Sequence, residues 1–314
     1  MRIHPIRTSC VTGMVVLFTA LATAACGSGA STSNGTSTSN GTSTSSSATT
    51  SASPSGQVSS IAAQVPAAVK AKGTLTVAAD ATYAPNEFIG SDGHTVVGMD
   101  ADLAAALGQV LGLKVNMVNA TFDTIIPGLA SDKYNLGVSS FTDTKVREQT
   151  VDFVTYFVAG TSFYVKTSGG PDVTSLAGLC GHKVAAEKGT TQQADAQAQA
   201  PKCASVGKPV TLLIFNDQNA VNLALSSGRA DVAMADSPVA AYQVKQSNGT
   251  FKLSGQPYGT APYGIAIPKN SGMAQPVLAA VEHLMANGTY MKILQKWGVQ
   301  EGAISNPVIN GAVS

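Results

Sequence analysis

The chain has 314 residues, of which 44% are apolar, 6% aromatic and 12% charged, and its formal net charge is +1. This near-neutral balance provides no basic excess for nucleic acid and no acidic tail that would act as a solvating arm. The Gly-rich, aromatic-poor composition is typical of an α/β globular protein, and the length is enough for two lobes behind an N-terminal extension.

The N-terminus has the pattern of an export signal. Arg2 and Arg7 form a short positive region, and Val11–Ala25 is an uncharged, mostly apolar stretch that is too short to span a bilayer comfortably. Small residues then precede Cys26. The segment resembles a bacterial lipoprotein signal, although Thr23 stands where such signals usually have Leu. An ordinary secretory signal cleaved nearby is the alternative.

We therefore expect residues 1–25 to be a signal peptide and Cys26 to carry the lipid. Residues 27–58 are mostly Ser, Thr, Gly, Asn and Ala, a composition that forms flexible coil with an end-to-end distance of about 30 Å at this length. Residues 26–63 are thus predicted to be a disordered tether. Without the signal, 17 basic and 18 acidic residues remain, a net charge of −1. The folded part is expected to be extracytoplasmic and anchored to the bacterial membrane by lipid.

Cysteine usage agrees with an oxidising compartment. Cys10 belongs to the signal and Cys26 to the anchor, which leaves Cys180 and Cys203 in the folded part. An isolated pair outside the cell is most simply a disulfide. A metal site and a catalytic thiol are the alternatives, but no second Cys or His lies at ligand spacing, and we expect neither metal nor cofactor.

From Gly73 the chain alternates short apolar runs with segments of helical period. Asp100 is the predicted N-cap of the first helix and Gly112 its end. This alternation favours a mostly parallel sheet covered by helices. In chain order, the elements predicted here are a strand at Thr74–Ala79, a helix at Ala101–Leu111, a strand at Lys114–Asn119, a helix at Phe122–Ala130 and a strand at Leu136–Ser140.

The pattern restarts near residue 180 and ends in a segment able to return to the first half. Two β/α halves make a two-lobed molecule with a cleft, and α/β sheets bind small ligands at the C-terminal ends of their strands. The predicted strands are Lys183–Ala186, Val210–Phe215, Asp231–Ala235, Phe251–Leu253 and Gly264–Pro268. The predicted helices are an Ala/Gln-rich one after Gly-Thr-Thr-Gln, then Gln218–Ser226, Ser237–Gln246, about 274–286 and 289–297.

Six short motifs occur in a fixed order between about Lys72 and Val299. Together they resemble the polar amino acid family of ABC-transporter substrate-binding proteins, whose known members bind histidine, lysine/arginine/ornithine or glutamine. The motifs are Asp80-Ala-Thr-Tyr-Ala-Pro, Val97-Gly-Met-Asp-Ala-Asp-Leu, Phe122-Asp-Thr-Ile-Ile-Pro-Gly-Leu, Ser139-Ser-Phe-Thr with Arg147, Lys188-Gly-Thr-Thr-Gln, and Gly228-Arg-Ala-Asp-Val-Ala-Met-Ala-Asp.

The resemblance implies a type II periplasmic-binding-protein-like fold, in which two α/β lobes joined by two crossover hinge strands close on the ligand. Lobe 1 would comprise residues 64–160 and 258–305, and lobe 2 residues 161–257, with a C-terminal tail at 306–314. It also implies a monomer that hands its ligand to an ABC permease.

The resemblance assigns two oppositely charged residues to the ends of an amino acid. Arg147 matches the arginine that grips the α-carboxylate, for which a guanidinium fork is well suited. Its alternative role is an ion pair with Glu148 or Asp152. Asp236 matches the carboxylate that accepts the α-ammonium, and its alternative role is to cap the helix beginning at Ser237.

Four hydroxyl residues complete the expected site for the α-groups. Ser139, Ser140 and Thr142 follow an apolar strand, where backbone N–H and hydroxyl groups of Ser140 and Thr142 can help to bind the carboxylate. Thr191 lies where a strand passes into a helix, whose free N–H groups attract anions. Its alternative is simple N-capping.

The remaining candidates surround the ligand side chain. Tyr83 and Phe122 match aromatic positions that sandwich it, although Phe122 also suits a helix core. Asp80 matches a position that contacts the polar end, and Glu187 falls where an apolar or amide residue is more familiar. Two carboxylates there favour a cation such as Lys, Arg, ornithine or His. Glu187 has an alternative partner in Lys188 or solvent.

The sequence thus predicts a receptor that captures a polar, possibly cationic, L-amino acid for an ABC importer, not an enzyme. One alternative is a cyclohexadienyl-dehydratase-like enzyme on the same fold, which needs a general acid or base aimed at a leaving group. The other is a ligand sensor for a signalling partner. No arrangement typical of nucleophilic catalysis or dinucleotide binding is suggested by the sequence.

Overall fold

The structure is a computed structural model that describes residues 54–313. The predicted signal peptide at 1–25, the predicted lipidation site Cys26 and the predicted tether up to residue 53 lie outside the described residues. Within the described part, no helix combines the length and the apolar character that a membrane crossing requires.

The N-terminal end of the described chain is helical. Helices α1 (Pro54–Gln64) and α2 (Ala67–Lys72) precede the first strand. The predicted coil at 27–58 and tether at 26–63 are therefore wrong from residue 54 onward. Ile61 and Val65 explain the difference, because both are buried in the core that also contains residues of the next long helix. Burial of these apolar side chains stabilises a segment whose flanking composition suggests coil.

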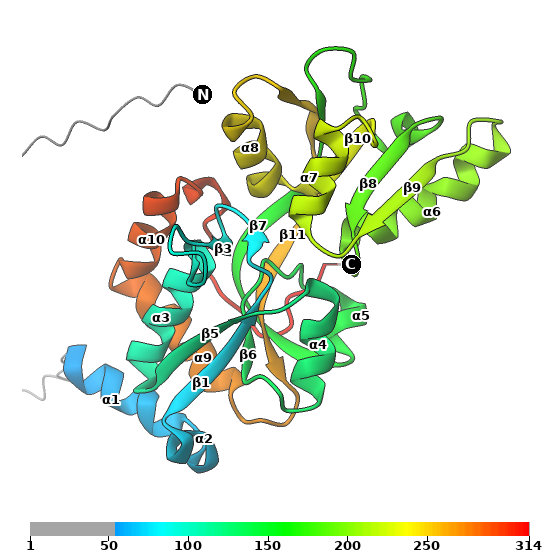
Figure 1. The fold of residues 1–314 in the computed structure, drawn as a ribbon. Coiled ribbons are helices and arrows are strands. Elements are labelled where there is room, and N and C mark those ends of the chain that lie inside the picture. The colour runs from blue at the N-terminus through cyan, green and yellow to red at the C-terminus, as the bar shows by residue number, and fades with distance from the viewer. Residues whose placement is uncertain (1–53, 314) are drawn as a thin grey trace, which may run out of the picture. The chain divides into compact units, whose positions relative to one another are not determined.

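An eight-stranded sheet in the order β5-β1-β6-β11-β7-β10-β8-β9 forms the centre of the fold (Figure 1). Strands β5, β1 and β6 are parallel, as are β9, β8 and β10. The predicted α/β class with mostly parallel sheets is confirmed. The strands are β1 (Thr74–Ala79), β5 (Lys114–Asn119), β6 (Leu136–Gly137), β7 (Val151–Lys166), β8 (Lys183–Glu187), β9 (Thr211–Phe215), β10 (Val232–Asp236) and β11 (Phe251–Pro268).

Two long antiparallel strands, β7 and β11, lie side by side and join the two parallel groups (Figure 1). Residues 161–165 of β7 pair with β10, whereas Ala266 of β11 pairs with β6. The predicted lobe boundaries at residues 160 and 257 fall inside these strands. Strand β7 was not predicted, because a strand buried on both faces lacks the alternation that marks a strand. Strand β11 was predicted as two separate pieces, because its first half is mostly exposed and its second half is buried.

A small antiparallel sheet lies next to the first group and was not predicted. It consists of β2 (Thr82–Tyr83), β3 (Glu87–Ile89) and β4 (Val96–Val97). These pairings are too short to give a recognisable sequence pattern. The sheet is functionally relevant because it carries Tyr83 and Glu87.

Helices cover both faces of the large sheet. On β1, Leu75 and Val77 face one apolar cluster with α3 and α9, while Ala78 faces another with α4, as the period of a strand requires. The helices are α3 (Met99–Leu111), α4 (Phe122–Ala130), α5 (Lys145–Glu148), α6 (Thr191–Ser205), α7 (Gln218–Ser226), α8 (Ser237–Gln246), α9 (Ala274–Ala286) and α10 (Thr289–Trp297), with 3-10 turns η1 (Leu176–Leu179) and η2 (Gln300–Gly302).

Helix α3 begins earlier than predicted. Its N-cap is Gly98, and Asp100 lies within the first turn instead of capping it. The Asp100 side chain is fully buried and accepts hydrogen bonds from the backbone N–H of Ser140 at 2.9 Å and from the hydroxyl of Tyr156 at 2.8 Å. Because the Asp100 carboxyl binds these internal donors, it does not cap the helix.

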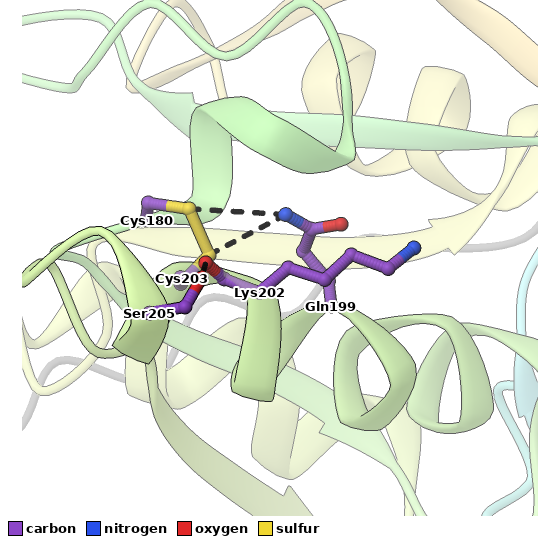
Figure 2. The surroundings of a disulfide bond; sticks show 5 residues. All are labelled: Cys180, Gln199, Lys202, Cys203 and Ser205. Atoms are coloured by element: carbon purple, nitrogen blue, oxygen red, sulfur yellow. Dashed lines mark hydrogen bonds between the residues drawn. A yellow bond between two sulfur atoms is a disulfide. The ribbon is translucent and has the colours of Figure 1, made fainter.

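The predicted disulfide between Cys180 and Cys203 is confirmed, with Cα atoms 5.0 Å apart (Figure 2). It links the end of η1 to α6, and the Gln199 amide lies beside it, 3.8 Å and 3.5 Å from the two sulfurs. The pairing closes a stretch of 23 residues in lobe 2.

The C-terminal segment lies along β7. The Thr155 N–H donates to the Val308 carbonyl and the Asn310 N–H to the Phe153 carbonyl, both at 2.9 Å. Gly311 then donates its N–H to Asp143 at 2.7 Å. These bonds fix the loop that leads into α5.

Candidate ligand-binding site

A cavity lies between the two lobes near the C-terminal ends of several parallel strands, where the sequence analysis expects a cleft. The empty space between its lining atoms, counted together with the adjoining open solvent, is about 320 Å³. Its lining residues are Tyr83, Phe122, Ser140, Thr142 and Arg147 on one side, and Thr190, Thr191, Gln192, Gln218, Ala235, Asp236 and Val239 on the other. Seven of the ten predicted ligand-binding residues are among them, while Asp80, Ser139 and Glu187 are buried outside the lining.

Arg147 is half-buried on the short helix α5 and its side chain enters the cavity lining. Its Nη1 donates to the Thr142 carbonyl at 2.7 Å, and its Nη2 donates across the cavity to the Gly189 carbonyl at 2.9 Å. The guanidinium also lies over the Phe122 ring, 5.2 Å from the ring centre. Its position is therefore fixed by main-chain and aromatic contacts instead of by an ion pair.

The alternative ion pairs of Arg147 do not form in the described part of the chain. Glu148 pairs with Lys145 at 3.0 Å, and Asp152 pairs with Lys269 at 3.2 Å. Burial lowers the pKa of Arg147 to about 10, while Asp236 acts in the opposite direction. The guanidinium remains charged at neutral pH and is available to an anionic ligand group.

Asp236 ends β10 and faces the same cavity. Its Oδ1 accepts a hydrogen bond from Gln192 at 2.7 Å, and its Oδ2 accepts one from the Tyr263 hydroxyl at 2.6 Å. It occupies the N-cap position of α8 but makes no side-chain capping bond. Burial raises the pKa of Asp236 to about 6, against the lowering effects of Tyr263, Gln192 and Arg147. The carboxyl is therefore largely ionised at pH 7 and points to the cavity, not to the helix.

The N-terminus of α6 forms another part of the lining. Its N-cap is Thr190, whose hydroxyl accepts from the Gln193 N–H at 3.1 Å, so Thr191 is not the cap. Thr191 is the first helical residue, and its backbone N–H has no acceptor within the helix. The positive end of a helix dipole thus faces the cavity on the side opposite Arg147.

The donors of Ser140 are engaged with buried protein carboxyls. Its backbone N–H donates to Asp100, and its hydroxyl donates to Glu87 at 3.1 Å while accepting from Asn86 at 2.9 Å. The expectation that these groups of Ser140 bind a ligand carboxylate is wrong for this structure. A buried carboxyl needs such donors. Because the N–H and the hydroxyl of Ser140 are engaged, its carbonyl is the polar group left for a ligand.

Ser139 belongs to the same buried network instead of the cavity. Its hydroxyl donates to Glu87 at 3.0 Å and accepts from the backbone N–H of Asp80 at 2.8 Å. Burial and the neighbouring Asp100 raise the pKa of Glu87 well above its usual value, and burial raises that of Asp100 to about 6. This carboxyl pair shapes the loop that carries Ser140.

The two predicted aromatic walls contact each other. Tyr83 and Phe122 meet edge to face with centroids 5.7 Å apart, and the second ring stacks on Phe141 at 4.5 Å. This structure therefore does not hold them as two parallel faces around an intervening group. Phe122 combines both roles that the sequence left open, because it is a buried core residue and also lines the cavity.

Two buried acids lie behind this aromatic wall. Asp80 accepts from the Thr82 hydroxyl at 2.7 Å and from the Phe122 N–H at 2.9 Å. Glu187, at the end of β8, is 1% exposed, and neither of its carboxyl oxygens accepts a hydrogen bond. The Tyr83 hydroxyl is likewise buried and unbonded, and Tyr83 and Glu187 are close enough to shift each other's pKa.

Glu187 has neither of the alternative partners that its sequence context suggests. It is shielded from solvent, and Lys188 turns away to pair with Asp123 at 2.8 Å. Burial raises the pKa of Asp80, and burial together with the charge of Asp80 raises the pKa of Glu187 to about 10. Among the residues that the structure describes, neither Asp80 nor Glu187 forms an ion pair with a cation.

Direct contacts between the two sides show that the cleft is closed. Lys188 pairs with Asp123, the Gln218 N–H donates to the Thr82 hydroxyl at 3.1 Å, and Arg147 reaches Gly189. Each contact joins residues that are distant in sequence and belong to different lobes.

Several lining residues were missed by the sequence analysis. Gln192 could have been predicted, because it stands in the Lys-Gly-Thr-Thr-Gln motif. Gln218 is the first residue of a predicted helix that begins shortly after a predicted strand. No sequence signal distinguishes Val239 from a core residue. The missed residues are Thr190, Gln192, Gln218, Ala235 and Val239.

The sequence profile of the bacterial extracellular solute-binding proteins, family 3, matches residues 75–300. The chain belongs to this family. The resemblance found from six motifs is confirmed, and so is an extracytoplasmic location for the folded part. Among residues 54–313, no group of three or more His, Cys, Asp or Glu is arranged to hold a metal ion.

Individual relatives give the same result. The arginine-binding protein ArgT of Corynebacterium glutamicum is 33% identical over 255 residues, which are 81% of this chain and 83% of that protein. An ancestral arginine-binding protein bound to arginine superimposes with a TM-score of 0.67 at 36% identity, covering 72% of this chain and 98% of that one. The predicted two-lobed binding-protein fold is confirmed.

A third relative bears on the enzyme alternative. The ancestral amino acid-binding protein AncCDT-1, described as a precursor of cyclohexadienyl dehydratase, has a TM-score of 0.66 and 33% identity over 73% of this chain and 97% of its own. It is itself a binding protein, as are the other relatives named above. The expectation of a binding protein rather than an enzyme is confirmed.

Proposed function

We propose that the protein captures an L-amino acid with a cationic side chain and delivers it to an ABC permease. The observation that carries this proposal is the position of Arg147 and Asp236 in the lining of the same cavity. Two opposite charges line one closed cavity from different lobes, at a position where a single dipolar solute can contact both.

In this proposal the α-carboxylate of the ligand binds Arg147 and the N-terminus of α6 at Thr191. A guanidinium has five N–H donors, so donors remain beside the bonds to Thr142 and Gly189. The α-ammonium binds Asp236 and the Ser140 carbonyl. Three or four charge-assisted bonds of about 1.5–3 kcal/mol each support micromolar affinity, or roughly −8 kcal/mol.

The cationic side chain is assigned to the end of the cavity where Tyr83 is backed by Asp80 and Glu187. A buried carboxylate whose oxygens lack hydrogen bonds, as those of Glu187 do, is stabilised when a cation with N–H donors reaches it. Two of the relatives are named as arginine-binding proteins, which supports the same class of ligand. Arginine is the first candidate because its planar guanidinium also stacks on aromatic rings.

Ligand binding and lobe closure are coupled in this mechanism. A ligand that bridges Arg147 and Asp236 makes contacts that exist only in the closed form, and it shifts the equilibrium by the free energy of those contacts. The proposal includes a monomer held to the membrane through lipid on Cys26 and a tether that ends by residue 53, so that the domain stays near its permease.

Calorimetry with Arg147→Ala tests the proposal. The variant removes the carboxylate ligand, and arginine affinity should fall by about 100-fold or more. Arg229→Ala is the matched control, because Arg229 is exposed and lies over Phe215; it should bind as the wild type does. A panel of the twenty amino acids, ornithine and citrulline identifies the ligand. Retention of affinity within threefold in the Arg147 variant would contradict the proposal.

A further inference from the structure

Both carboxyl oxygens of Glu187 are buried and neither has a hydrogen bond, and within residues 56–313 this holds for no other carboxyl group. Other buried acids satisfy their oxygens at least in part: Asp80 accepts from Thr82 and Phe122, and Asp236 accepts from Gln192 and Tyr263. Glu187 therefore lacks the donors that a buried carboxylate requires.

The groups that act on Glu187 come from four different elements. They are Asp80 at the end of β1, Tyr83 on β2, Tyr164 on β7 and Asp217, the N-cap of α7. All are acidic or phenolic. The adjacent Lys188 is committed to Asp123 and does not neutralise the cluster.

The cluster lies directly against the cavity. Tyr83 and Gln218 are lining residues, and the Gln218 amide donates to the Tyr164 hydroxyl at 2.8 Å. The groups around Glu187 thus adjoin the cavity in which the proposed ligand binds.

We propose that Glu187 holds a proton in the ligand-free protein and releases it to solvent when a cationic ligand side chain binds, so that uptake of a cationic amino acid is coupled to the release of one proton. This inference rests on the proposed function. In the exchange, the carboxylic acid of Glu187 loses its proton to the buffer, and the resulting carboxylate pairs with the ligand cation, so the net charge of the site is unchanged.

The physical reason is the cost of a buried charge. Burial and the neighbouring Asp80 favour the protonated form and raise the pKa of Glu187 to about 10, which keeps the acid neutral at pH 7. A bound guanidinium supplies the missing donors and a positive charge, and both lower a carboxyl pKa. A neutral ligand of the same shape, such as citrulline, supplies no charge and leaves the proton in place.

Titration calorimetry at pH 7.5 in buffers of different ionisation enthalpy counts the protons released. We expect arginine to release nearly one proton more than citrulline, and arginine affinity to rise by up to about tenfold per pH unit between pH 6.5 and 8. Asp236 contributes little at this pH, because its pKa of about 6 keeps it ionised, and it acts equally on both ligands.

The Glu187→Gln variant tests whether the released proton comes from Glu187. Glutamine is the neutral counterpart of the protonated acid, so the variant should fold but lose the extra proton release with arginine. Glu282→Gln makes the same chemical change at an exposed position on α9 and should leave the count unchanged.

Equal proton release with arginine and citrulline, or full release in the Glu187 variant, overturns the inference and leaves the proposed function standing. If citrulline or the variant does not bind, the test is the number of protons that the wild-type protein releases on binding arginine. Release of no proton overturns the inference. Absence of binding by every amino acid instead overturns the proposed function itself.

Discussion

At the scale of single residues, Arg147 and Asp236 are each held from both sides of the cavity. Arg147 bonds to Thr142 beside it and to Gly189 opposite. Asp236 bonds to Gln192 beside it and to Tyr263 opposite. The contacts within one lobe keep each charged group oriented when the lobes separate, and this pre-organisation lowers the entropy that binding must overcome.

Asp236→Asn tests the ammonium contact at this scale. The change keeps the shape of the side chain but removes its negative charge, so arginine affinity should fall by about tenfold or more. The corresponding 2-oxo acid, which lacks the amine, should lose much less. Calorimetry with both ligands measures the difference, with Asp172→Asn at an exposed position as the control. An equal loss for both ligands would show that the assignment is wrong.

At the scale of elements, the turn between β8 and α6 brings the two lobes together. Gly189 has a φ of 81°, and a Cβ placed there would lie 2.9 Å from the Cβ of Asp123 and 3.1 Å from its Cα. The neighbouring Lys188 makes its ion pair with the same residue. The close approach of Gly189 to Asp123 and the ion pair between Lys188 and Asp123 therefore occur at the same place. A side chain at position 189 would obstruct closure.

Gly189→Ala should accordingly weaken ligand binding by about tenfold or more, since the closed form must absorb a contact below 3 Å. Gly207→Ala is the matched control, because Gly207 has a φ of 73° and open space around it. Both changes introduce similar backbone strain, about 1 kcal/mol, but only the first should reduce affinity. Calorimetry and thermal unfolding of the pair separate closure from folding, and equal affinities would refute the obstruction.

At the scale of the whole molecule, the described chain is organised around β7 and β11, which span 16 and 18 residues. They connect the parallel strands of both lobes, although none of their residues lines the cavity. The disulfide between Cys180 and Cys203 lies within lobe 2 and shares no residue with the cavity lining. Its role is consequently structural, and binding should not depend on it.

Thiol titration of the denatured protein without reductant should find no free Cys180 or Cys203. Reduction should destabilise the fold by about 3 kcal/mol, the chain-entropy value for a loop of this length. Ligand affinity at a temperature where the reduced protein stays folded should be unchanged. Two titratable thiols in the untreated protein, or an affinity that falls on reduction, would contradict this separation of roles.

The sequence by itself determined the family and the local elements. Strand Lys114–Asn119 and helix Gln218–Ser226 have the predicted bounds, because their apolar period and end signals are local. The family resemblance carried by six motifs singled out Arg147 and Asp236 as the oppositely charged pair. The sequence also predicted the disulfide, since only two cysteines remained to be paired.

Only the tertiary structure decided what depends on residues distant in the chain. It showed that α1 is helical because Ile61 finds a core, and that Ser140 is occupied because Glu87 and Asp100 are buried beside it. It left both carboxyl oxygens of Glu187 without a hydrogen bond, although Lys188 follows it directly. The burial of a side chain and the identity of its hydrogen-bond partners depend on packing between distant segments. A local pattern of residues therefore does not predict them.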